Sequence, residues 1–313
     1  MPEISVLMTA YNSERFIKEA IDSILNQTFS DFEFIIVDDG STDQTARIVE
    51  SYNDQRIRFF RCEHLGRTNA LNYALKQVAT PLVAFMDSDD ISFPTRLEEQ
   101  YKFLEKHPEI GLVSAWHYRV TETGKIKRLV RLPVNDNEIR ARIYRYSPVT
   151  FPCCMVRKTF IDAIGEFNQS LYVGIDYEFI SRLLRVTKFA NLPKPLLYYR
   201  QHSNALTKNM KEEDFVRIYN FLSEHLNYEF QEETIQKHNP DYLFKKGLLE
   251  FYYGSVSKSR KYFIDAFLCG KPNMNDFYYI VLSLPGDIII HFLRRCIDMS
   301  RRFILRVFWK TNP

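Results

Sequence analysis

The sequence predicts an α/β protein with a mostly parallel central sheet covered by helices on both faces. Apolar runs of strand length alternate with helical segments, giving four strands and three helices in fewer than a hundred residues. This alternation is typical of parallel sheets with crossover helices. Glycine is scarce, at 10 of 313 residues, which argues against a loop-rich β protein. The length suggests about two domains and a core that needs no disulfides.

Local signals justify the expected elements in order. Asn12 or Ser13 can cap the first helix, and Ser41 or Thr42 can cap the second, because their side-chain oxygens accept from free backbone N–H groups. The expected strands cover residues 4–9, 32–37, 56–62, 82–86 and 110–116, with a hairpin turn at 121–125. The expected helices begin near residues 12, 41, 67, 93, 135, 158 and 176. We expect the α/β domain to cover residues 1–208, a helical subdomain to cover 209–275, and an apolar, basic segment to cover 276–313.

Charge and cysteine content exclude several classes of protein. Lys and Arg number 42 against 39 Asp and Glu, a net charge of +3, so the chain is neither a nucleic-acid polycation nor an acidic disordered tail. The five cysteines include no Cys-x-x-Cys pair, which indicates reduced thiols rather than a disulfide framework. The start of the sequence lacks a basic signal-peptide region, and no charge-free run approaches the about 18 residues of a spanning helix. These features predict a cytoplasmic protein without a nucleic-acid partner.

Carboxylates follow two of the expected strands directly. Asp38 and Asp39 follow the second strand, and the segment 87–90, Asp-Ser-Asp-Asp, follows the fourth. Five carboxylates at neighbouring strand ends would repel one another without a counter-charge, and Mg²⁺ or Mn²⁺ prefers such oxygen ligands. The alternative is that each cluster is only a turn and a helix cap. We favour a metal and phosphate site for segment 87–90, because Pro94 delays the next helix.

The turn after the first strand excludes other nucleotide-binding folds. It carries Thr9, Ala10, Tyr11 and Asn12 in place of Gly-x-Gly-x-x-Gly, and the chain has no Walker A loop. A haloacid-dehalogenase phosphatase would carry its Asp-x-Asp after the first strand, whereas here the motif follows the fourth.

The order and spacing of six motifs resemble the inverting family-two glycosyltransferases with the GT-A fold, of the bacterial cell-surface glycan type. The motifs are VLMTAYN at 6–12, ILNQTF at 24–29, IIVDDGSTD at 35–43, FMDSDD at 85–90, GIDYEF at 174–179 and YRQH at 199–202. The resemblance covers roughly residues 3–208. It implies the GT-A fold, a nucleotide-sugar donor and a divalent metal.

The resemblance also implies a donor site at the first turn. Thr9, Tyr11 and Asp39 would hold the nucleoside, with Asp39 accepting from the base, and Ala10 and Asn12 belong to the same motif.

The remaining motifs imply the diphosphate side and the catalytic base. Asp87 would lie near the ribose with Ser88 beside it, and Asp89 would bind the metal that bridges the diphosphate. Asp176 would be the general base. Asn72, in Asn-Tyr-Ala, stands where the family has Asn-x-Gly, and we count it with the donor site.

The residue types are consistent with this chemistry. A sugar hydroxyl is a poor nucleophile and needs a positioned base, and the leaving diphosphate needs its charge neutralised. One base and direct displacement imply inversion. The alternative for Asp176 is a simple helix cap.

Three further basic side chains are candidates for phosphate or metal contact. Arg200 and His202 follow an apolar run, and we expect Arg200 to contact the donor and His202 to contact the metal. The alternative for His202 is a surface or capping role. Arg67 could contact the donor phosphates or lie solvated at the start of its helix.

The last segment predicts contact with a membrane surface. On a helix, residues 293–310 place six basic side chains on one half and bulky apolar ones mainly on the other. The alternative is a terminal helix docked on the protein.

We therefore expect a cytoplasmic, membrane-peripheral hexosyltransferase with Mn²⁺ or Mg²⁺. Its donor would be a nucleotide diphosphate-sugar, with UDP favoured, and its acceptor a hydroxyl of a glycan or a lipid-linked glycan. The alternatives are a nucleotidyltransferase that makes activated sugars and a scaffold that has lost catalysis.

Overall fold

The computed structural model describes residues 2–143, 147–171 and 173–202, and further along the chain residues 243, 244, 247, 251 and 256–269. The chain divides into two compact units, Met1–Glu229 and Phe230–Pro313. The domain boundary expected near residue 208 lies outside the described residues, and so does the basic segment 276–313.

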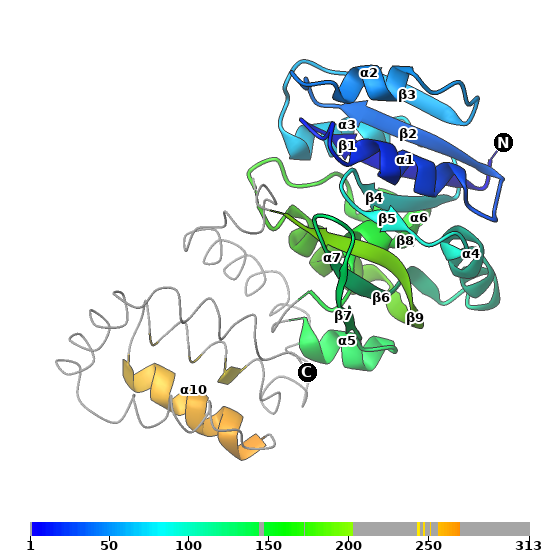
Figure 1. Ribbon diagram of the computed structural model, residues 1–313. Helices are drawn as coiled ribbons and strands as arrows, with labels where there is room; N and C mark the ends of the chain where they lie inside the picture. The colour runs from blue at the N-terminus through cyan, green and yellow to red at the C-terminus, as the bar shows by residue number, and fades with distance from the viewer. Residues whose placement is uncertain are drawn as a thin grey trace. The chain divides into compact units, whose positions relative to one another are not determined.

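The first unit contains one nine-stranded sheet and its covering helices (Figure 1). The strands are β1 (Ile4–Ala10), β2 (Phe32–Asp38), β3 (Ile57–Arg61), β4 (Leu82–Asp87), β5 (Ile91–Ser92), β6 (Ile110–Thr121), β7 (Ile126–Val130), β8 (Met155–Arg157) and β9 (Lys188–Gln201). The helices are α1 (Ile17–Leu25), α2 (Thr45–Glu50), α3 (Arg67–Lys76), α4 (Arg96–Lys106), α5 (Asp136–Arg142), α6 (Lys158–Ile164) and α7 (Ile175–Val186), with a 3₁₀ turn η1 (Phe151–Cys153). The fold class predicted from the sequence is confirmed.

The sheet is parallel in its first half and mixed in its second. Its order is β3-β2-β1-β4-β8-β6-β9-β5, and β7 pairs with β6. β1, β2, β3 and β4 run parallel, as the alternating pattern predicted. β8 is antiparallel to both β4 and β6, whereas β6 and β9 are parallel. The predicted hairpin joins β6 to β7, and Gly124 supplies the left-handed φ of 81° that the turn needs.

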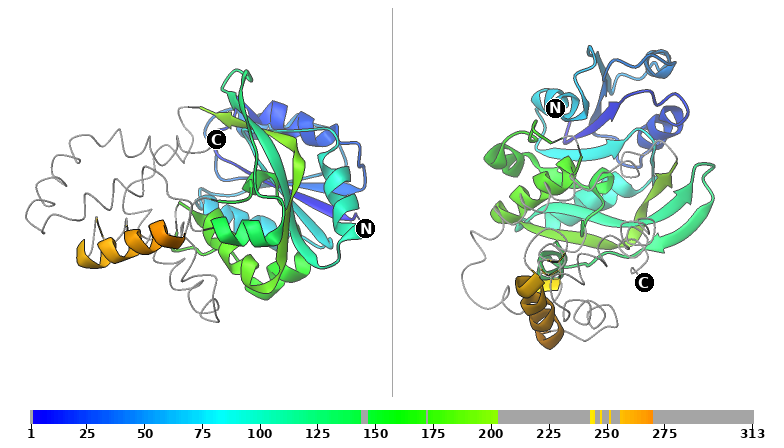
Figure 2. Two further views of the ribbon diagram at one scale, coloured as in Figure 1. Left: turned by 90° about the horizontal axis from the view of Figure 1, so that it is seen from below. Right: turned by 90° about the vertical axis from the view of Figure 1, so that its left-hand side faces the viewer.

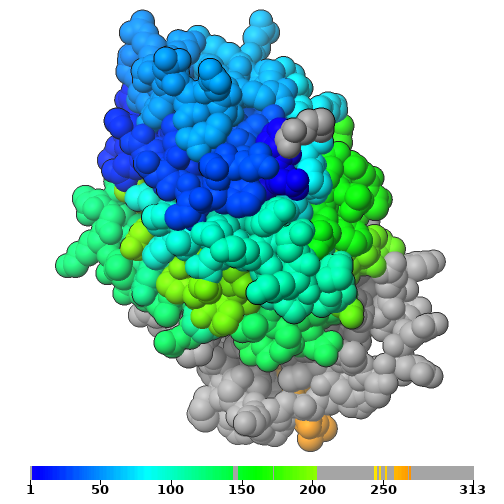
Figure 3. All heavy atoms as spheres, turned by 90° about the vertical axis from the view of Figure 1, so that its right-hand side faces the viewer, coloured from blue at the N-terminus to red at the C-terminus, as the bar shows by residue number. Residues whose placement is uncertain are grey.

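Helices cover both faces of the sheet (Figure 2). Alternate residues of β1, among them Val6 and Met8, face a core shared with α1 and α4. Figure 3 shows the side of the molecule on which α1 and α4 lie, with the first fifty residues packed against the segment around α4. The opposite face carries aromatic packing, in which Phe85 of β4 stacks on Phe151 at 4.6 Å and Phe167 stacks on Phe179 of α7 at 4.0 Å between ring centroids.

Three helices start later than expected. The helix expected near residue 12 begins at Ile17, and neither Asn12 nor Ser13 caps it through a side chain. The helix expected at 41 or 42 begins at Thr45, because Ser41 and Thr42 form hydrogen bonds with the turn after β1 instead. The helix expected at 93 begins at Arg96, because the short strand β5 and Pro94 precede it. By contrast, α7 begins at Ile175, directly after Gly174.

In the second unit, the described residues are one helix, α10 (Val256–Cys269), and four residues that precede it. Phe263 of α10 contacts the rings of Phe244 and Phe251 at centroid distances of 5.5 and 6.3 Å. Among the described residues, no helix is both long and apolar enough to cross a membrane.

Candidate functional site

The turn after β1 is tied to the turn after β2. Asn12 adopts a left-handed φ of 48°, which Asn tolerates better than most residues. Its backbone N–H donates to Ser41 Oγ at 2.9 Å, and its side-chain Oδ1 accepts from the Thr42 N–H at 2.9 Å. Ala10 is buried, and its carbonyl accepts from the Asp39 N–H at 2.8 Å. The parallel pairing of β1 with β2 thus brings these turns together at one edge of the sheet.

Asp39 organises the loop that leads into α3. Its buried carboxylate accepts from the N–H of Leu65 at 2.6 Å and from the N–H of Gly66 at 3.0 Å. The same loop carries His64, whose ring stacks on Tyr11 with centroids 4.3 Å apart. The Tyr11 side chain is 47% exposed, so its ring is accessible. Tyr11, His64 and Asp39 together form what we call the aromatic shelf, and the sequence offered no signal for His64.

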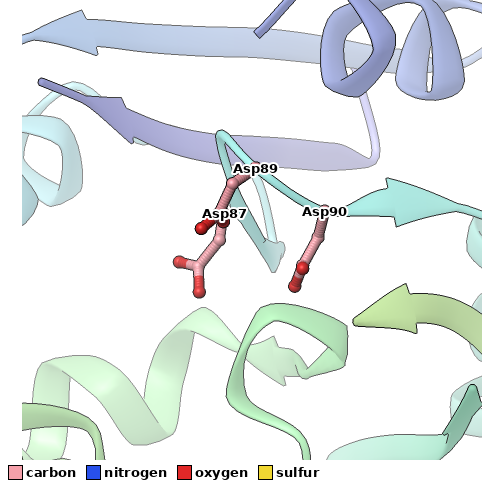
Figure 4. A group of neighbouring side chains, drawn as sticks. All are labelled: Asp87, Asp89 and Asp90. Atoms are coloured by element: carbon pink, nitrogen blue, oxygen red, sulfur yellow. The ribbon is translucent and has the colours of Figure 1, made fainter. Parts of the chain in front are cut away.

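The acidic cluster lies beside that shelf. Asp87 ends β4, where it pairs with Thr9 of β1, and Asp89 and Asp90 follow in the loop to β5. One carboxylate oxygen from each of the three lies within 4.8 Å of the others. All three side chains extend from the loop toward the same side (Figure 4). Ser88 points elsewhere, because its hydroxyl is 2.8 Å from the Ser13 hydroxyl near the turn after β1.

The carboxylates of the cluster disfavour one another's ionisation. Burial, followed by the charges of Asp89 and Asp176, raises the pKa of Asp87 to about 6, although Arg67, whose Nη2 is 3.5 Å from Asp87 Oδ1, acts in the opposite direction. Burial is also the main reason why the pKa of Asp90 is well above its ordinary value, and Asp89 and Asp87 add to the shift. The nearby arginines therefore offset the burial and mutual repulsion of these carboxylates only in part.

The donor atoms of the cluster suit a hard divalent cation. Asp90 Oδ1 accepts from the Arg200 N–H at 2.8 Å, but Asp90 Oδ2 is buried and has no hydrogen-bond partner among the described residues. His202 Nε2 lies 2.7 Å from Asp89 Oδ2, so the structure brings these two expected metal ligands together. Carboxylate oxygens with unmet charge are the ligands that Mg²⁺ and Mn²⁺ prefer.

Arg200 is buried, and its guanidinium braces the loop that carries Asp89. Its Nε donates to the Asp89 carbonyl at 2.8 Å, its Nη1 to the Glu122 carbonyl at 2.5 Å, and its Nη2 to Glu19 Oε2 at 2.5 Å. The guanidinium also lies over the Phe16 ring, 4.8 Å from the centroid. These contacts are structural, and the donor contact expected for Arg200 stays a prediction.

Asn72 of α3 is buried. Its amide group donates to the Phe167 carbonyl at 3.0 Å and accepts from the Phe167 N–H at 2.8 Å, which fixes α3 to the segment before α7. A donor contact for Asn72 likewise stays a prediction.

Asp176 lies in the first turn of α7 and is half-buried. Gly174 precedes the helix with a left-handed φ of 70°, and no side chain caps the start of the helix. The charge of Asp176 raises the pKa of Asp87, so the expected base lies near the acidic cluster.

Tyr199 also belongs to the site, and the sequence analysis missed it as an individual residue. Burial and the charges of Asp90, Asp87, Asp89 and Asp176 raise the pKa of its phenol. Strand alternation was the available signal. Tyr199 directly precedes Arg200 on β9, so the two side chains point to opposite faces of the sheet.

Comparison with known proteins identifies the family. The model of glycosyl transferase family 2 matches residues 5–165, which is half of the chain. The chain belongs to glycosyl transferase family 2. An uncharacterized glycosyltransferase of Methanocaldococcus jannaschii is 34% identical over 67% of this chain and 76% of its own length. The O-antigen biosynthesis glycosyltransferase WbnJ of Escherichia coli is 32% identical over 65% of this chain and 82% of its own length.

A solved structure agrees with the GT-A fold of this family 2 protein. Residues 1–349 of S. aureus TarS, crystallised in complex with UDP, superpose with a TM-score of 0.62 at 21% identity. The match covers 96% of this chain and 88% of the TarS chain. The protein is therefore a glycosyltransferase by family, and its catalytic fold is GT-A.

Proposed function

We propose that this family 2 glycosyltransferase moves a hexose from a nucleotide diphosphate-sugar to a hydroxyl of a glycan or lipid-linked glycan, with inversion and with Mg²⁺ or Mn²⁺. The observation that carries the proposal is the acidic cluster beside the aromatic shelf. A nucleoside on the shelf would direct its diphosphate toward the carboxylates, whose charge Arg67 offsets only in part, so that a cation is called for.

Each part of the donor has a candidate partner. Tyr11 offers an exposed ring for stacking on a base, and Asp39 offers an acceptor at the back of the shelf. Asp89 and His202 would hold the cation, which when bound supplies positive charge to the leaving diphosphate. UDP is the nucleotide to test first, since TarS was crystallised with it.

Asp176 is our candidate for the general base. It lies close enough to the acidic cluster to affect Asp87 electrostatically, and no side chain caps the start of α7. A carboxylate at this place could accept the proton of the attacking hydroxyl, and a single base of this kind fits inversion. The relative named for O-antigen biosynthesis supports a glycan as the acceptor.

Nucleotide binding and donor turnover test the proposal. UDP with Mg²⁺ should raise Tm, because a ligand that binds only the native state stabilises it by about 2.7 kcal/mol at a hundred times its Kd. UMP, which lacks the second phosphate, is the matched control and should gain little from Mg²⁺. UDP release from a panel of UDP-sugars then measures turnover.

Three outcomes separate the alternatives. Absence of stabilisation by UDP and other nucleoside diphosphates contradicts the proposal. Pyrophosphate release from a nucleoside triphosphate and a sugar 1-phosphate identifies a nucleotidyltransferase instead. Binding of UDP without turnover of any donor points to a scaffold that has lost catalysis.

We also propose that residues 276–313 bring the enzyme to the cytoplasmic membrane surface. The support is the amphipathic, basic pattern of the sequence, with each basic side chain contributing about 1 kcal/mol near an anionic surface. The full chain should co-sediment with anionic liposomes, and less so as salt rises. A protein that lacks residues 285–313 should stay folded and remain in the supernatant. Lack of liposome binding by the full chain, together with a lower Tm of the truncated one, would show that the segment docks on the protein.

A further inference from the structure

Helix α3 begins at the candidate site. The two backbone N–H groups just before it donate to the Asp39 carboxylate. Its first residue, Arg67, places Nη2 3.5 Å from Asp87 Oδ1. Burial opposes the shift, but the charges of Asp87 and Asp176 raise the pKa of the Arg67 guanidinium. The start of α3 is therefore tied to the aromatic shelf and to the acidic cluster, and it lies near the candidate base.

One face of α3 holds the segment that precedes α7. Thr68 and Asn72 are four positions apart, so they share a face of the helix, and both are buried. Thr68 Oγ1 donates to the Leu171 carbonyl at 2.9 Å. The Asn72 amide group contacts both backbone groups of Phe167, donating to the carbonyl at 3.0 Å and accepting from the N–H at 2.8 Å. These hydrogen bonds fix the backbone of residues 167–171 to α3.

Helix α7 is attached to the same segment from its other side. The rings of Phe167 and Phe179 stack with centroids 4.0 Å apart. Arg182 donates to the Ile164 carbonyl at 2.6 Å and to the Glu166 carbonyl at 2.8 Å. Because no side chain caps the start of α7, the position of its first turn depends on the backbone packed against it. Segment 164–171 therefore connects α3 to the helix that carries the candidate base.

We propose that Asn72, together with Thr68, is a positioning residue for glycosyl transfer: it holds segment 164–171 against α3 and so keeps Asp176 beside the acidic cluster. The inference rests on the proposed function for the role of Asp176 as the base, whereas the hold on α7 does not depend on it. A base acts only within hydrogen-bond reach of the hydroxyl that it deprotonates. A displacement of about 1 Å can lower the rate about 10² fold. Asn72 would thus affect turnover without touching the donor.

The test compares turnover with nucleotide affinity in Asn72→Ala. This substitution leaves the N–H and the carbonyl of Phe167 unpaired. The kcat of UDP release from a panel of UDP-sugars should fall about tenfold or more, because the base is no longer held in place. The Kd of UDP with Mg²⁺, measured by calorimetry, should stay within about twofold. Loss of a donor contact would instead weaken UDP binding.

Asn191→Ala is the matched control. Asn191 is also buried, and its amide group donates to the carbonyls of Pro133 and Pro148 at 2.6 and 2.9 Å. Its loss should lower Tm in the same way, but neither proline belongs to the candidate site. At temperatures well below Tm, Asn191→Ala should therefore keep the kcat of the unaltered protein.

A second pair of variants keeps the test decisive if Asn72→Ala does not fold. Thr68→Val retains the shape of the side chain but removes the hydroxyl that binds the Leu171 carbonyl, so kcat should fall while the Kd of UDP stays the same. Thr68→Ser keeps the hydroxyl and should restore most of the turnover. Equal kcat in Thr68→Val and Thr68→Ser would contradict the positioning role.

The other outcomes are equally clear. Equal kcat in Asn72→Ala and Asn191→Ala overturns the proposal, and so does a rise of about tenfold in the Kd of UDP in Asn72→Ala, since Asn72 would then serve the donor. If the unaltered protein releases UDP from no donor, the proposed function fails instead. Hydrogen exchange of the amides of residues 174–178 then decides: faster exchange in Asn72→Ala than in Asn191→Ala supports the hold on α7, and equal exchange overturns it.

Discussion

Replacing Asp87 by Asn should stabilise the ligand-free protein while it weakens metal-dependent nucleotide binding. Asp87 ends β4, Asp89 and Asp90 follow in the loop to β5, and one oxygen of each lies within 4.8 Å of the others. Asn has nearly the same size but no charge, so the substitution removes repulsion and leaves packing intact. The nearby Arg67, at 3.5 Å, opposes the gain, because it loses its charged partner.

The magnitude and its pH dependence follow from the pKa of Asp87, which is about 6 in the folded protein against an ordinary 3.8. A carboxyl whose pKa is raised by folding costs stability when it ionises. The cost begins above about pH 4, grows up to about pH 6 and is constant beyond. About two pKa units correspond to roughly 3 kcal/mol. The side chain of Asp87 is 32% exposed, and solvent screening together with the loss of Arg67 reduces the expected gain to about 1–2 kcal/mol.

The assay is thermal unfolding with EDTA from about pH 4.5 to about pH 8, where about 1 kcal/mol moves Tm by about 2–4 °C in a protein of this size. Asp87→Asn should melt higher than the unaltered protein near neutral pH, and the difference should shrink toward pH 4.5. Asp31→Asn is the control, since Asp31 is exposed and its substitution should change little. A lower Tm for Asp87→Asn, or a difference independent of pH, would refute the reasoning about the acidic cluster.

The remaining predictions concern the base, the metal, the nucleoside and the brace. Asp176→Asn should lower UDP release from the donor about 10² fold or more with nearly unchanged UDP affinity, and turnover at the normal rate would leave Asp176 without a catalytic role. Calorimetry should show that Asp89→Ala abolishes the tightening of UDP binding by Mg²⁺, whereas Asp39→Ala weakens UDP binding with or without the metal; unchanged metal dependence in Asp89→Ala would contradict its assignment. Arg200→Gln should lower the free energy of unfolding by about 3 kcal/mol, because its buried guanidinium braces three elements. The exposed Arg15→Gln should change it by under about 1 kcal/mol, and equal effects of the two would argue against the brace.

Patterns that act over a few residues made the first half of the fold predictable. Strand length, apolar alternation and the placement of helices between strands identified the four parallel strands, because a buried parallel strand must be apolar and must be followed by a crossover. The proximity of the acidic residues at the ends of β2 and β4 was also predictable, because the carboxyl ends of parallel strands meet at one edge of the sheet. The hairpin was readable because Gly124 supplies a left-handed turn.

The second half of the sheet was harder to predict from the sequence. β8 has three residues and β5 has two, too few to show a period, and each pairs with a strand that is distant in the sequence. β9 contains two prolines, which count against a strand in any local pattern, and its register against β6 shifts near them.

The sequence by itself determined the family motifs, the parallel strands and the presence of carboxylates at the strand ends. Only the tertiary structure decided which partners the polar side chains take. Arg200 contacts Glu19, which is 181 residues away, and Asn72 contacts Phe167, which is 95 residues away. Tyr199 joins the acidic cluster and Arg128 faces Arg119 through strand register alone. Local propensity and periodicity carry no information over such separations, because these contacts arise only when packing and sheet pairing bring distant segments together.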